Sequence, residues 1–284
     1  MGKFDHILLT VDYDRTLTAP DSTIPARNLE AIRYFMENGG AFTLNTGRST
    51  PMASSLLETL PVNAPFLLYN GSAAYDLTRK ELMQCRPIDL DPEALVADLL
   101  ARFPDLSLEV QGTDAHYLFR KNPGWEAFND HNRCPWAYAD EKAVPRPFIK
   151  FAMYGQFRDK TVASMYEATP EERARIDAAV AYVEKTYGEV VDVFRPCARI
   201  VDFHAKGVSK IQAARDLQKT LGRPVLVCVG DAENDVSMLT GADYAYCPAD
   251  GVVADRFENV CECAEGAVAD VIYKKIPEIP PVRP

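Results

Sequence analysis

The fold of this chain is limited above all by short, uninterrupted apolar runs that alternate with amphipathic helical stretches. HILLTVD and AFTLNTG are two such runs near the N-terminus, and IPARNLEAIRYFMENGG between them has helical spacing and stops at two glycines. A run without alternation is typical of a strand buried on both faces of a parallel sheet. The pattern resumes where PVLVCVGD follows the helical stretch SKIQAARDLQKTLG. The sequence therefore predicts an α/β fold, with a Rossmann-like, doubly wound and mostly parallel sheet.

The middle of the chain has a different pattern. DPEALVADLLARF and PEERARIDAAVAYVEKTYG read as amphipathic helices, and LSLEVQGTDAHYLF, PFIKFAMYGQ and EVVDVFRP read as strands of a separate, antiparallel sheet. Because a complete βα pattern flanks this segment, we expect an insertion into one domain. The predicted core comprises residues 1–82 and 195–284, and residues 83–194 form a smaller α/β cap domain.

Composition excludes several classes of partner. The net charge of −10 argues against a nucleic acid. No apolar run is long enough to span a membrane, and we expect no signal peptide because the N-terminus lacks a long apolar region and a cleavage site. Seven dispersed cysteines without a CxxC pair favour reduced thiols, and therefore a cytoplasmic location.

The predicted core strands run into polar residues at their carboxyl ends, where a parallel α/β sheet binds its ligands. Clustered carboxylates repel one another unless a cation lies between them, and all-oxygen ligands favour a hard ion such as Mg²⁺. Such an ion, a lysine and backbone N–H groups could together hold a phosphate. The residues concerned are Asp12, Asp14, Thr46, Gly47, Arg48, Asn70, Lys210, Asp231, Asn234 and Asp235.

Four short segments, in order, carry a resemblance to a known family. DYDRTLT, LNTGRS, KGVSK and VGDAENDVSML match the motifs of the haloacid dehalogenase superfamily. Their spacing and the long insertion resemble the Cof-type subfamily of sugar-phosphate phosphatases. The resemblance implies a Mg²⁺-dependent phosphatase that hydrolyses small phosphorylated metabolites, with sugar phosphates first, through an aspartyl-phosphate intermediate. It also implies that the inserted cap sets substrate specificity.

The resemblance implies four catalytic residues. Asp12 is the nucleophile, and Asp14 is the general acid and then the general base. Thr46 hydrogen-bonds the transferring phosphoryl group. Lys210 bridges the phosphate and Asp12.

The remaining site residues implied by the resemblance bind phosphate or metal. The resemblance implies that Asn234 supports the phosphate, and we also expect phosphate contacts from Gly47, Arg48 and the backbone N–H of Tyr13. The Mg²⁺ ligands are Asp12, Asp14 through its backbone carbonyl, and Asp231, while Asp235 orients metal-bound water or Lys210.

Two features depart from the family pattern. Arg15 stands where the family usually has glycine, and we expect it to adopt a negative φ with its side chain outside the metal site. YAYCPADG replaces the usual stretch after the fourth motif, so no function is transferred to Cys247–Ala249.

Several alternatives stay open. Lys206 competes with Lys210 for the catalytic position, but Lys210 fits the motif spacing and the start of a helix. A phosphomutase also forms an aspartyl phosphate and returns the group to a sugar. A regulatory protein without catalytic activity could keep the fold. The protein is either a monomer or a homodimer.

Overall fold

The computed structural model describes residues 2–54, 56, 60–76, 78–155 and 168–280. The chain divides into two compact units, which we call the core and the cap. The core comprises Met1–Gly47, Thr59–Gln84 and Ser209–Pro284, and the cap comprises Arg48–Glu58 and Cys85–Val208. The cap therefore contains residues 195–208, which the sequence pattern had assigned to the core.

The core is built on a five-stranded sheet in which every pairing is parallel. The order is β14-β13-β12-β1-β2. The strands are β1 (Ile7–Val11), β2 (Ala41–Leu44), β12 (Val225–Val229), β13 (Tyr244–Pro248) and β14 (Glu258–Val260). Every residue of β1, β2 and β12 is buried, which explains the continuous apolar runs. The predicted doubly wound α/β core is confirmed.

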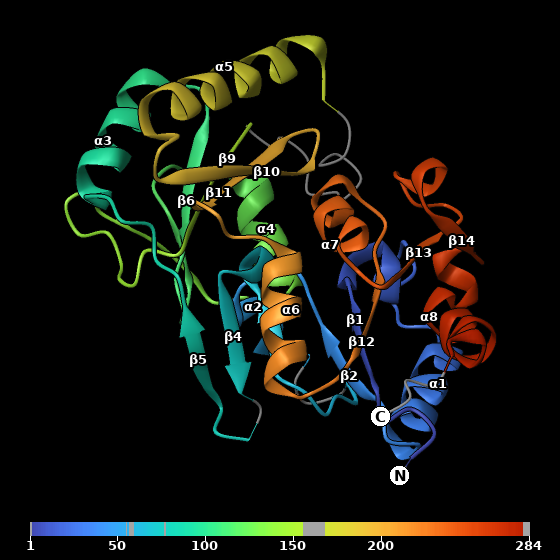
Figure 1. Cartoon of the computed structure of the whole chain (residues 1–284). Helices are drawn as coiled ribbons and strands as arrows, with labels where there is room; N and C mark the ends of the chain where they lie inside the picture. The colour runs from blue at the N-terminus through green and yellow to red at the C-terminus, as the bar shows by residue number, and fades with distance from the viewer. Residues whose placement is uncertain (1, 55, 57–59, 77, 156–167, 281–284) are drawn as a thin grey trace. The chain divides into compact units, whose positions relative to one another are not determined.

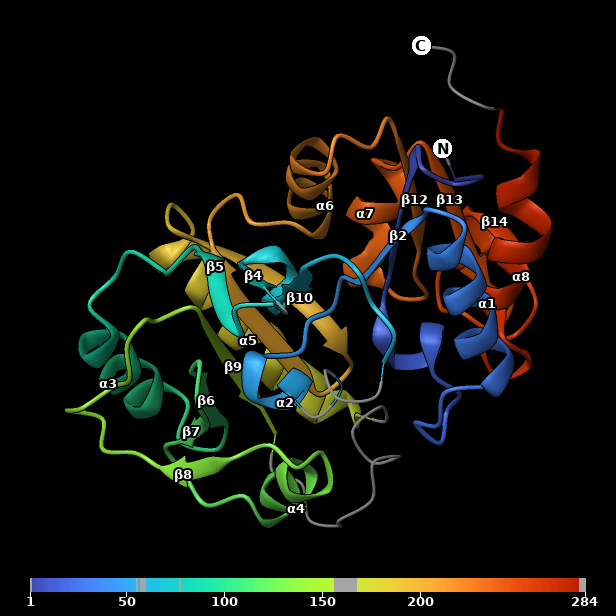
Figure 2. The same ribbon diagram turned by 90° about the horizontal axis from the view of Figure 1, so that it is seen from below.

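Helices cover both faces of this sheet. Figures 1 and 2 show α1 (Ala26–Glu37) and α8 (Ala267–Asp270) on one side, and α6 (Lys210–Thr220) and α7 (Val236–Thr240) on the other. Ser209 caps the start of α6, where its side chain accepts a hydrogen bond from the N–H of Gln212. Because α6 begins there, its first residue lies at the carboxyl edge of the sheet, next to the end of β1.

A hairpin extends the core beyond β2. β3 (Phe66–Leu68) and β4 (Ala73–Asp76) are antiparallel, and β5 (Glu81–Cys85) lies beside β4. The turn uses positive φ at Tyr69, Asn70 and Gly71, with values of 50°, 53° and 97°. Asn70 and Gly71 therefore lie in the turn of this hairpin. A parallel bridge between Asn45 and Leu67 connects the end of β2 to β3.

The cap has its own sheet, in the order β10-β11-β9-β6-β7-β8. One face is apolar and packs against α3 (Pro92–Arg102) and α5 (Pro170–Tyr187). α5 starts at a capping box formed by Thr169 and Glu172. The strands are β6 (Ser107–Gln111), β7 (His116–Leu118), β8 (Trp136–Tyr138), β9 (Lys150–Tyr154), β10 (Val191–Cys197) and β11 (Ile200–Ala205), and the helices are α2 (Thr50–Ser54), α3 (Pro92–Arg102), α4 (Pro123–His131) and α5 (Pro170–Tyr187).

Within the part of the chain that the structure describes, no helix combines the length and the apolar character needed to cross a membrane.

Candidate active site

Asp12 lies at the carboxyl end of the central strand of the core. It directly follows β1, and its N–H donates to the carbonyl of Val229 at the end of β12, at 2.9 Å. This bond fixes Asp12 between two parallel strand ends. The residue is buried, but its side chain keeps 9% of its surface exposed, so that a small ligand can reach it.

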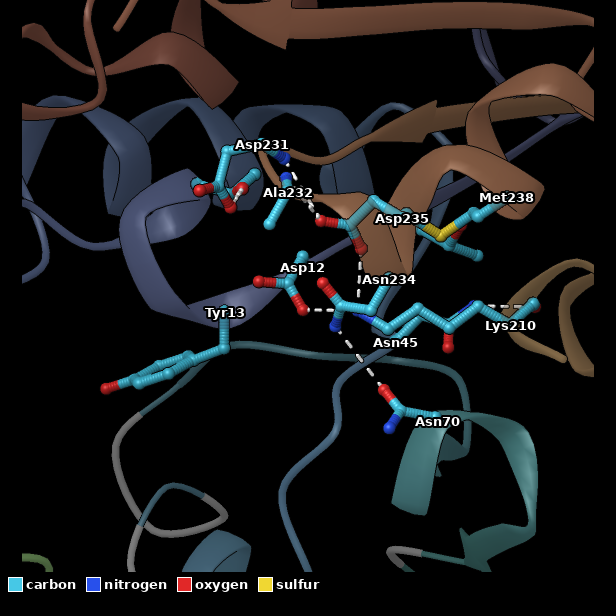
Figure 3. Close-up of polar contacts among 12 residues, drawn as sticks. Asp12, Tyr13, Asn45, Asn70, Lys210, Asp231, Ala232, Asn234, Asp235 and Met238 are labelled. Carbon is cyan, nitrogen blue, oxygen red and sulfur yellow. Dashed lines mark hydrogen bonds and ion pairs between the residues drawn. The ribbon is translucent and has the colours of Figure 1, made fainter. Parts of the chain in front are cut away.

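Asp231 and Asp235 follow β12 and come close to Asp12. Asp235 ends a single helical turn, and one of its oxygens accepts hydrogen bonds from the N–H groups of Asp231 and Ala232, both at 3.1 Å. A Cβ at Gly230 would lie 2.6 Å from the Cβ of Asp235, so only glycine permits this close approach. Figure 3 shows the carboxylates of Asp12, Asp231 and Asp235 turned toward one another.

Lys210 is the cation of this cluster. It opens α6 and is completely buried, and its Nζ donates to Asp12 Oδ1 and to Asp235 Oδ1, each at 2.6 Å. Burial lowers the pKa of Lys210, but the two carboxylates outweigh burial and raise the pKa above its ordinary value. The lysine is therefore charged, and the three carboxylates around it leave an excess of negative charge.

Burial, and to a smaller extent the neighbouring carboxylates, raise the pKa values of the carboxyl groups. Burial raises the pKa of Asp12 well above its ordinary value, although the charge of Lys210 acts in the opposite direction. Burial and then the charge of Asp235 raise the pKa of Asp231 to about 7, against a hydrogen bond from Thr16 that lowers it. A cation bound here would favour the ionised form of both groups.

The carboxylates fit a divalent ion. Oxygen atoms of Asp12, Asp231 and Asp235 lie within 4.8 Å of one another. A single hard cation contacts its oxygen ligands at about 2.0–2.6 Å, so ligand atoms on opposite sides of it are at most about 5 Å apart. The donor set is all oxygen, which suits Mg²⁺ or Ca²⁺ rather than a thiolate-seeking ion. Asp14, predicted to ligate through its carbonyl, is half-buried in the turn that follows Asp12.

Residues after β2 and β3 meet at the same edge of the core. The N–H of Thr46 donates to Leu67 O at 2.9 Å, and its carbonyl accepts from the N–H of Asn70 at 3.0 Å. A Cβ at Gly47 would lie 2.9 Å from Asn70 Oδ1, so a side chain there would press on Asn70. Asn234 Nδ2 donates to the same Oδ1 at 3.4 Å. The structure thus brings the predicted Thr46, Gly47 and Asn234 together through Asn70.

Other predicted residues are placed differently. Arg48 belongs to the cap, where its charge opposes the burial that raises the pKa of Cys134 to about 12. The ring of Tyr13 is buried and directed away from the carboxylates (Figure 3). Binding of phosphate by the backbone N–H of Tyr13 stays a prediction. Lys206 is exposed and pairs with Asp192 at 2.7 Å, as expected for a solvated lysine.

The negative φ expected for Arg15 is wrong. Its φ is 59° and its ψ is 10°, in the left-handed region that costs a residue with a side chain about 1–2 kcal/mol. The turn imposes this conformation, because Asp14 before it is extended and the N–H of Arg15 donates to Thr18 Oγ1 at 3.2 Å. The charge of Arg15 also lowers the pKa of Asp231, after the larger effects of burial, Asp235, Thr16 and Lys210.

The segment YAYCPADG, which departs from the family pattern, lies next to the backbone of Asp231. Two residues after this segment, the N–H of Val253 donates to Asp231 O at 3.2 Å. A Cβ at Gly251 would lie 2.6 Å from Cys247 Sγ and 3.2 Å from Asp231 Cα. Gly251 of this segment thus lies against the backbone of Asp231, and burial and then the charge of Asp231 raise the pKa of Cys247 to about 12.

Sequence reasoning missed two residues of the site. Thr16 is fully buried, and its hydroxyl donates to Asp231 Oδ1 at 2.8 Å. Asn45 is also fully buried, and its Nδ2 donates to Lys210 O at 2.9 Å. The available signal was a polar residue directly beside a motif position, Thr16 two residues after Asp14 and Asn45 one residue before Thr46.

Known proteins share this fold and part of the sequence. Residues 9–261 match the family model of haloacid dehalogenase-like hydrolases. An uncharacterized hydrolase of Schizosaccharomyces pombe is 24% identical over 292 residues, which cover 96% of this chain and 92% of that protein. The 5-amino-6-(5-phospho-D-ribitylamino)uracil phosphatase of Bacillus subtilis is 33% identical over 110 residues, 39% of this chain and 37% of that one. The solved structure of a subclass IIB sugar phosphatase of the superfamily matches with a TM-score of 0.75 at 17% identity, over 96% of this chain and 99% of its own.

Proposed function

The chain belongs to the family of haloacid dehalogenase-like hydrolases, as the resemblance of its motifs predicted, and from this premise we propose that it is a Mg²⁺-dependent phosphatase of small phosphorylated metabolites. The reaction is hydrolysis of a phosphate monoester in two steps. The phosphoryl group passes first to Asp12 and then to water. We place the enzyme in the cytoplasm, which agrees with free thiols at Cys85, Cys134, Cys228, Cys247, Cys261 and Cys263.

One observation carries the proposal. Lys210 Nζ lies 2.6 Å from an oxygen of Asp12 and 2.6 Å from an oxygen of Asp235, inside a buried group of carboxylates at the end of a parallel sheet. A carboxylate is a useful nucleophile toward a phosphate dianion only where positive charge reduces the repulsion between them. The lysine supplies such charge at the attacking atom, so the arrangement favours attack by Asp12.

The residues on the turn after β1 divide the proton chemistry. Asp12 attacks phosphorus, and its bond to Lys210 orients the attacking carboxylate. Asp14 donates a proton to the leaving alkoxide and then takes one from the water that hydrolyses the aspartyl phosphate. Asp14 is less buried than Asp12, which suits a group that must exchange protons with solvent.

Asp12, Asp231 and the backbone carbonyl of Asp14 would hold Mg²⁺, with Asp235 fixing Lys210 and metal-bound water. When bound, the ion supplies positive charge that offsets the charge of the phosphoryl oxygens. Thr16, through its bond to Asp231 Oδ1, leaves the other carboxylate oxygen of Asp231 for the ion.

We assign phosphate binding mainly to residues that follow β2 and to the side chain that meets them through Asn70. We assign the contacts to Thr46, to the backbone at Gly47 and Tyr13, and to the amide of Asn234. Asn70 accepts a hydrogen bond from the amide of Asn234, and its side chain lies close to Gly47. Arg48 is a further candidate, since it follows Gly47 directly.

Sugar phosphates are the first substrate class that we propose. One similar structure is that of a sugar phosphatase, and one similar curated protein is a phosphatase whose substrate carries a phosphoribityl group. We assign specificity within this class to the cap, and we propose a monomer or a homodimer.

A panel of phosphorylated metabolites tests the proposal. Purified protein with Mg²⁺ should release inorganic phosphate from at least one sugar phosphate and from an aryl phosphate, and EDTA should abolish release until Mg²⁺ is restored. Isomerised product without phosphate release would identify a phosphomutase instead. Turnover of no phosphoester, or full turnover in EDTA, would contradict the proposal.

A further inference from the structure

Asn45 links two elements that carry the reacting groups. It follows β2 immediately and is completely buried. Its N–H donates to the carbonyl of Val11, the residue before Asp12, at 2.9 Å. Its side-chain Nδ2 donates to the carbonyl of Lys210, also at 2.9 Å. One residue therefore holds the strand of Asp12 with its backbone and the start of α6 with its side chain.

These bonds close a ring around the predicted nucleophile. Lys210 Nζ donates to Asp12 Oδ1 at 2.6 Å, and the peptide bond from Val11 to Asp12 completes the circuit through Asn45 (Figure 3). A lysine side chain has four rotatable bonds, so the position of its Nζ depends on where its backbone is held. The tie at Asn45 fixes that backbone against the strand end to which Asp12 belongs.

The amide of Asn45 has only one workable orientation. Its partner is a carbonyl oxygen, which accepts and cannot donate, so the nitrogen must face Lys210. Its Oδ1 is then buried and has no hydrogen-bond partner among the residues that the structure describes. A buried acceptor without a partner destabilises the fold by about 1–3 kcal/mol. An apolar side chain would avoid this cost, so stability alone does not explain an asparagine here.

We propose that Asn45 is a positioning residue, which sets Lys210 Nζ against Asp12 by holding the first turn of α6. The inference rests on the proposed function, because it assigns Asn45 a role in attack by Asp12. It predicts that loss of the donor slows the chemical step while leaving the folded state intact.

Replacement by leucine provides the test. Asn45→Leu keeps most of the side-chain volume and removes both the donor and the buried Oδ1. With para-nitrophenyl phosphate and Mg²⁺, kcat should fall about 10- to 100-fold, the size expected when a reacting group is misplaced by about 1 Å. KM should change less than about threefold, and Tm should stay within a few degrees of the wild type. A crystal structure of the variant should show Lys210 Nζ farther from Asp12 Oδ1.

Asn63 offers a matched control. Its amide also bonds two backbone groups of the core, Gly40 O at 2.9 Å and the N–H of Phe42 at 2.8 Å, at the start of β2 and away from Lys210. Asn63→Ala should lower Tm and leave kcat unchanged. If Asn45→Leu does not fold, Asn45→Ala replaces it with the same expected loss of kcat.

The outcomes separate the inference from the function on which it rests. A kcat of Asn45→Leu within twofold of the wild type overturns the positioning role, and so does a fall in kcat with Lys210 Nζ unmoved. A loss of kcat matched by a similar loss in Asn63→Ala also overturns it. Asp12→Asn, measured in parallel, reports on the function itself. If that variant keeps full activity, the proposed function fails first.

Discussion

The raised pKa of Asp231 makes the stability of the folded protein depend on pH. Burial and the charge of Asp235 raise this pKa to about 7, and burial raises the pKa of Asp12 in the same direction. The unfolded chain has an ordinary carboxyl pKa of about 4. The folded, metal-free protein therefore binds these protons more tightly than the unfolded chain. Its stability falls as pH rises from about 4 toward 7.

A divalent cation should reverse this loss where the carboxylates are ionised. In EDTA, Tm should decrease between pH 5 and pH 8, and the increase in Tm on adding Mg²⁺ should be larger at pH 8 than at pH 5. Thermal melts at both pH values, with and without the ion, measure the difference. An increase that is equal or larger at pH 5 would show that protons and the cation do not compete for these carboxylates.

The backbone conformation of Arg15 could not be predicted from the identity of this residue alone. The absence of glycine suggested an ordinary negative φ, yet the residue adopts 59°. The conformation is set by the whole turn, in which the Thr18 hydroxyl accepts the N–H of Arg15 and the Thr18 N–H bonds Tyr13 O at 3.1 Å. The hydrogen bonds of the turn that brings Asp14 next to Asp12 determine the φ of Arg15 more strongly than the preference of its side chain for a negative φ.

Among the elements, strands were predicted more accurately than helix faces. Continuous apolar runs identified β1, β2 and β12, because burial on both faces leaves no ambiguity. The helical spacing predicted α1 itself, but not that the helix buries Asn28 together with Ala31, Ile32 and Phe35. Asn28 is buried because its amide bonds Leu17 O and the N–H of Ala269, both at 2.9 Å. No local pattern reveals a partner 241 residues away.

The hairpin turn and α6 give a prediction at the same scale. A Cβ at Gly71 would lie 2.5 Å from the carbonyl of Ser209, the cap of α6, and the φ of Gly71 is +97°. Gly71→Ala should therefore destabilise the protein by at least about 2 kcal/mol and lower kcat, because the start of α6 must move. Gly222 at the other end of α6 also has a positive φ, +63°, but its Cβ would meet nothing within 4 Å.

Gly222→Ala is thus the matched control, with backbone strain but no collision. Gly222→Ala should lower the free energy of unfolding by only about 1 kcal/mol and leave kcat unchanged. Urea unfolding and steady-state kinetics of both variants provide the comparison. Equal effects on kcat would mean that the contact between the hairpin turn and α6 does not position Lys210.

For the molecule as a whole, the motif residues were predictable and their mutual geometry was not. The sequence could propose Asp12 and Asp231 because parallel strands end at one edge of a sheet, and Lys210 because it fits the motif spacing and the start of a helix. It could not predict that Lys210 bridges two carboxylates, since this depends on how α6 is held by Asn45 and by the turn at Gly71. Nor could it predict that residues 48–58 belong to the cap, because that short segment carries no cap-like pattern of its own.

The central claim is that Asp12 accepts the phosphoryl group, and phosphate release by Asp12→Asn tests it most directly. This variant keeps the shape of the side chain, and Lys210 keeps its bond to Asp235 at 2.6 Å, so we expect a folded protein with unchanged Tm. Asp192→Asn, which alters the pair with Lys206 and the hydrogen bond that Asp192 accepts from the N–H of Gly207, should keep full activity. The account predicts a loss of at least about 1000-fold in kcat for Asp12→Asn; a folded Asp12→Asn variant that releases phosphate at the wild-type rate would contradict it.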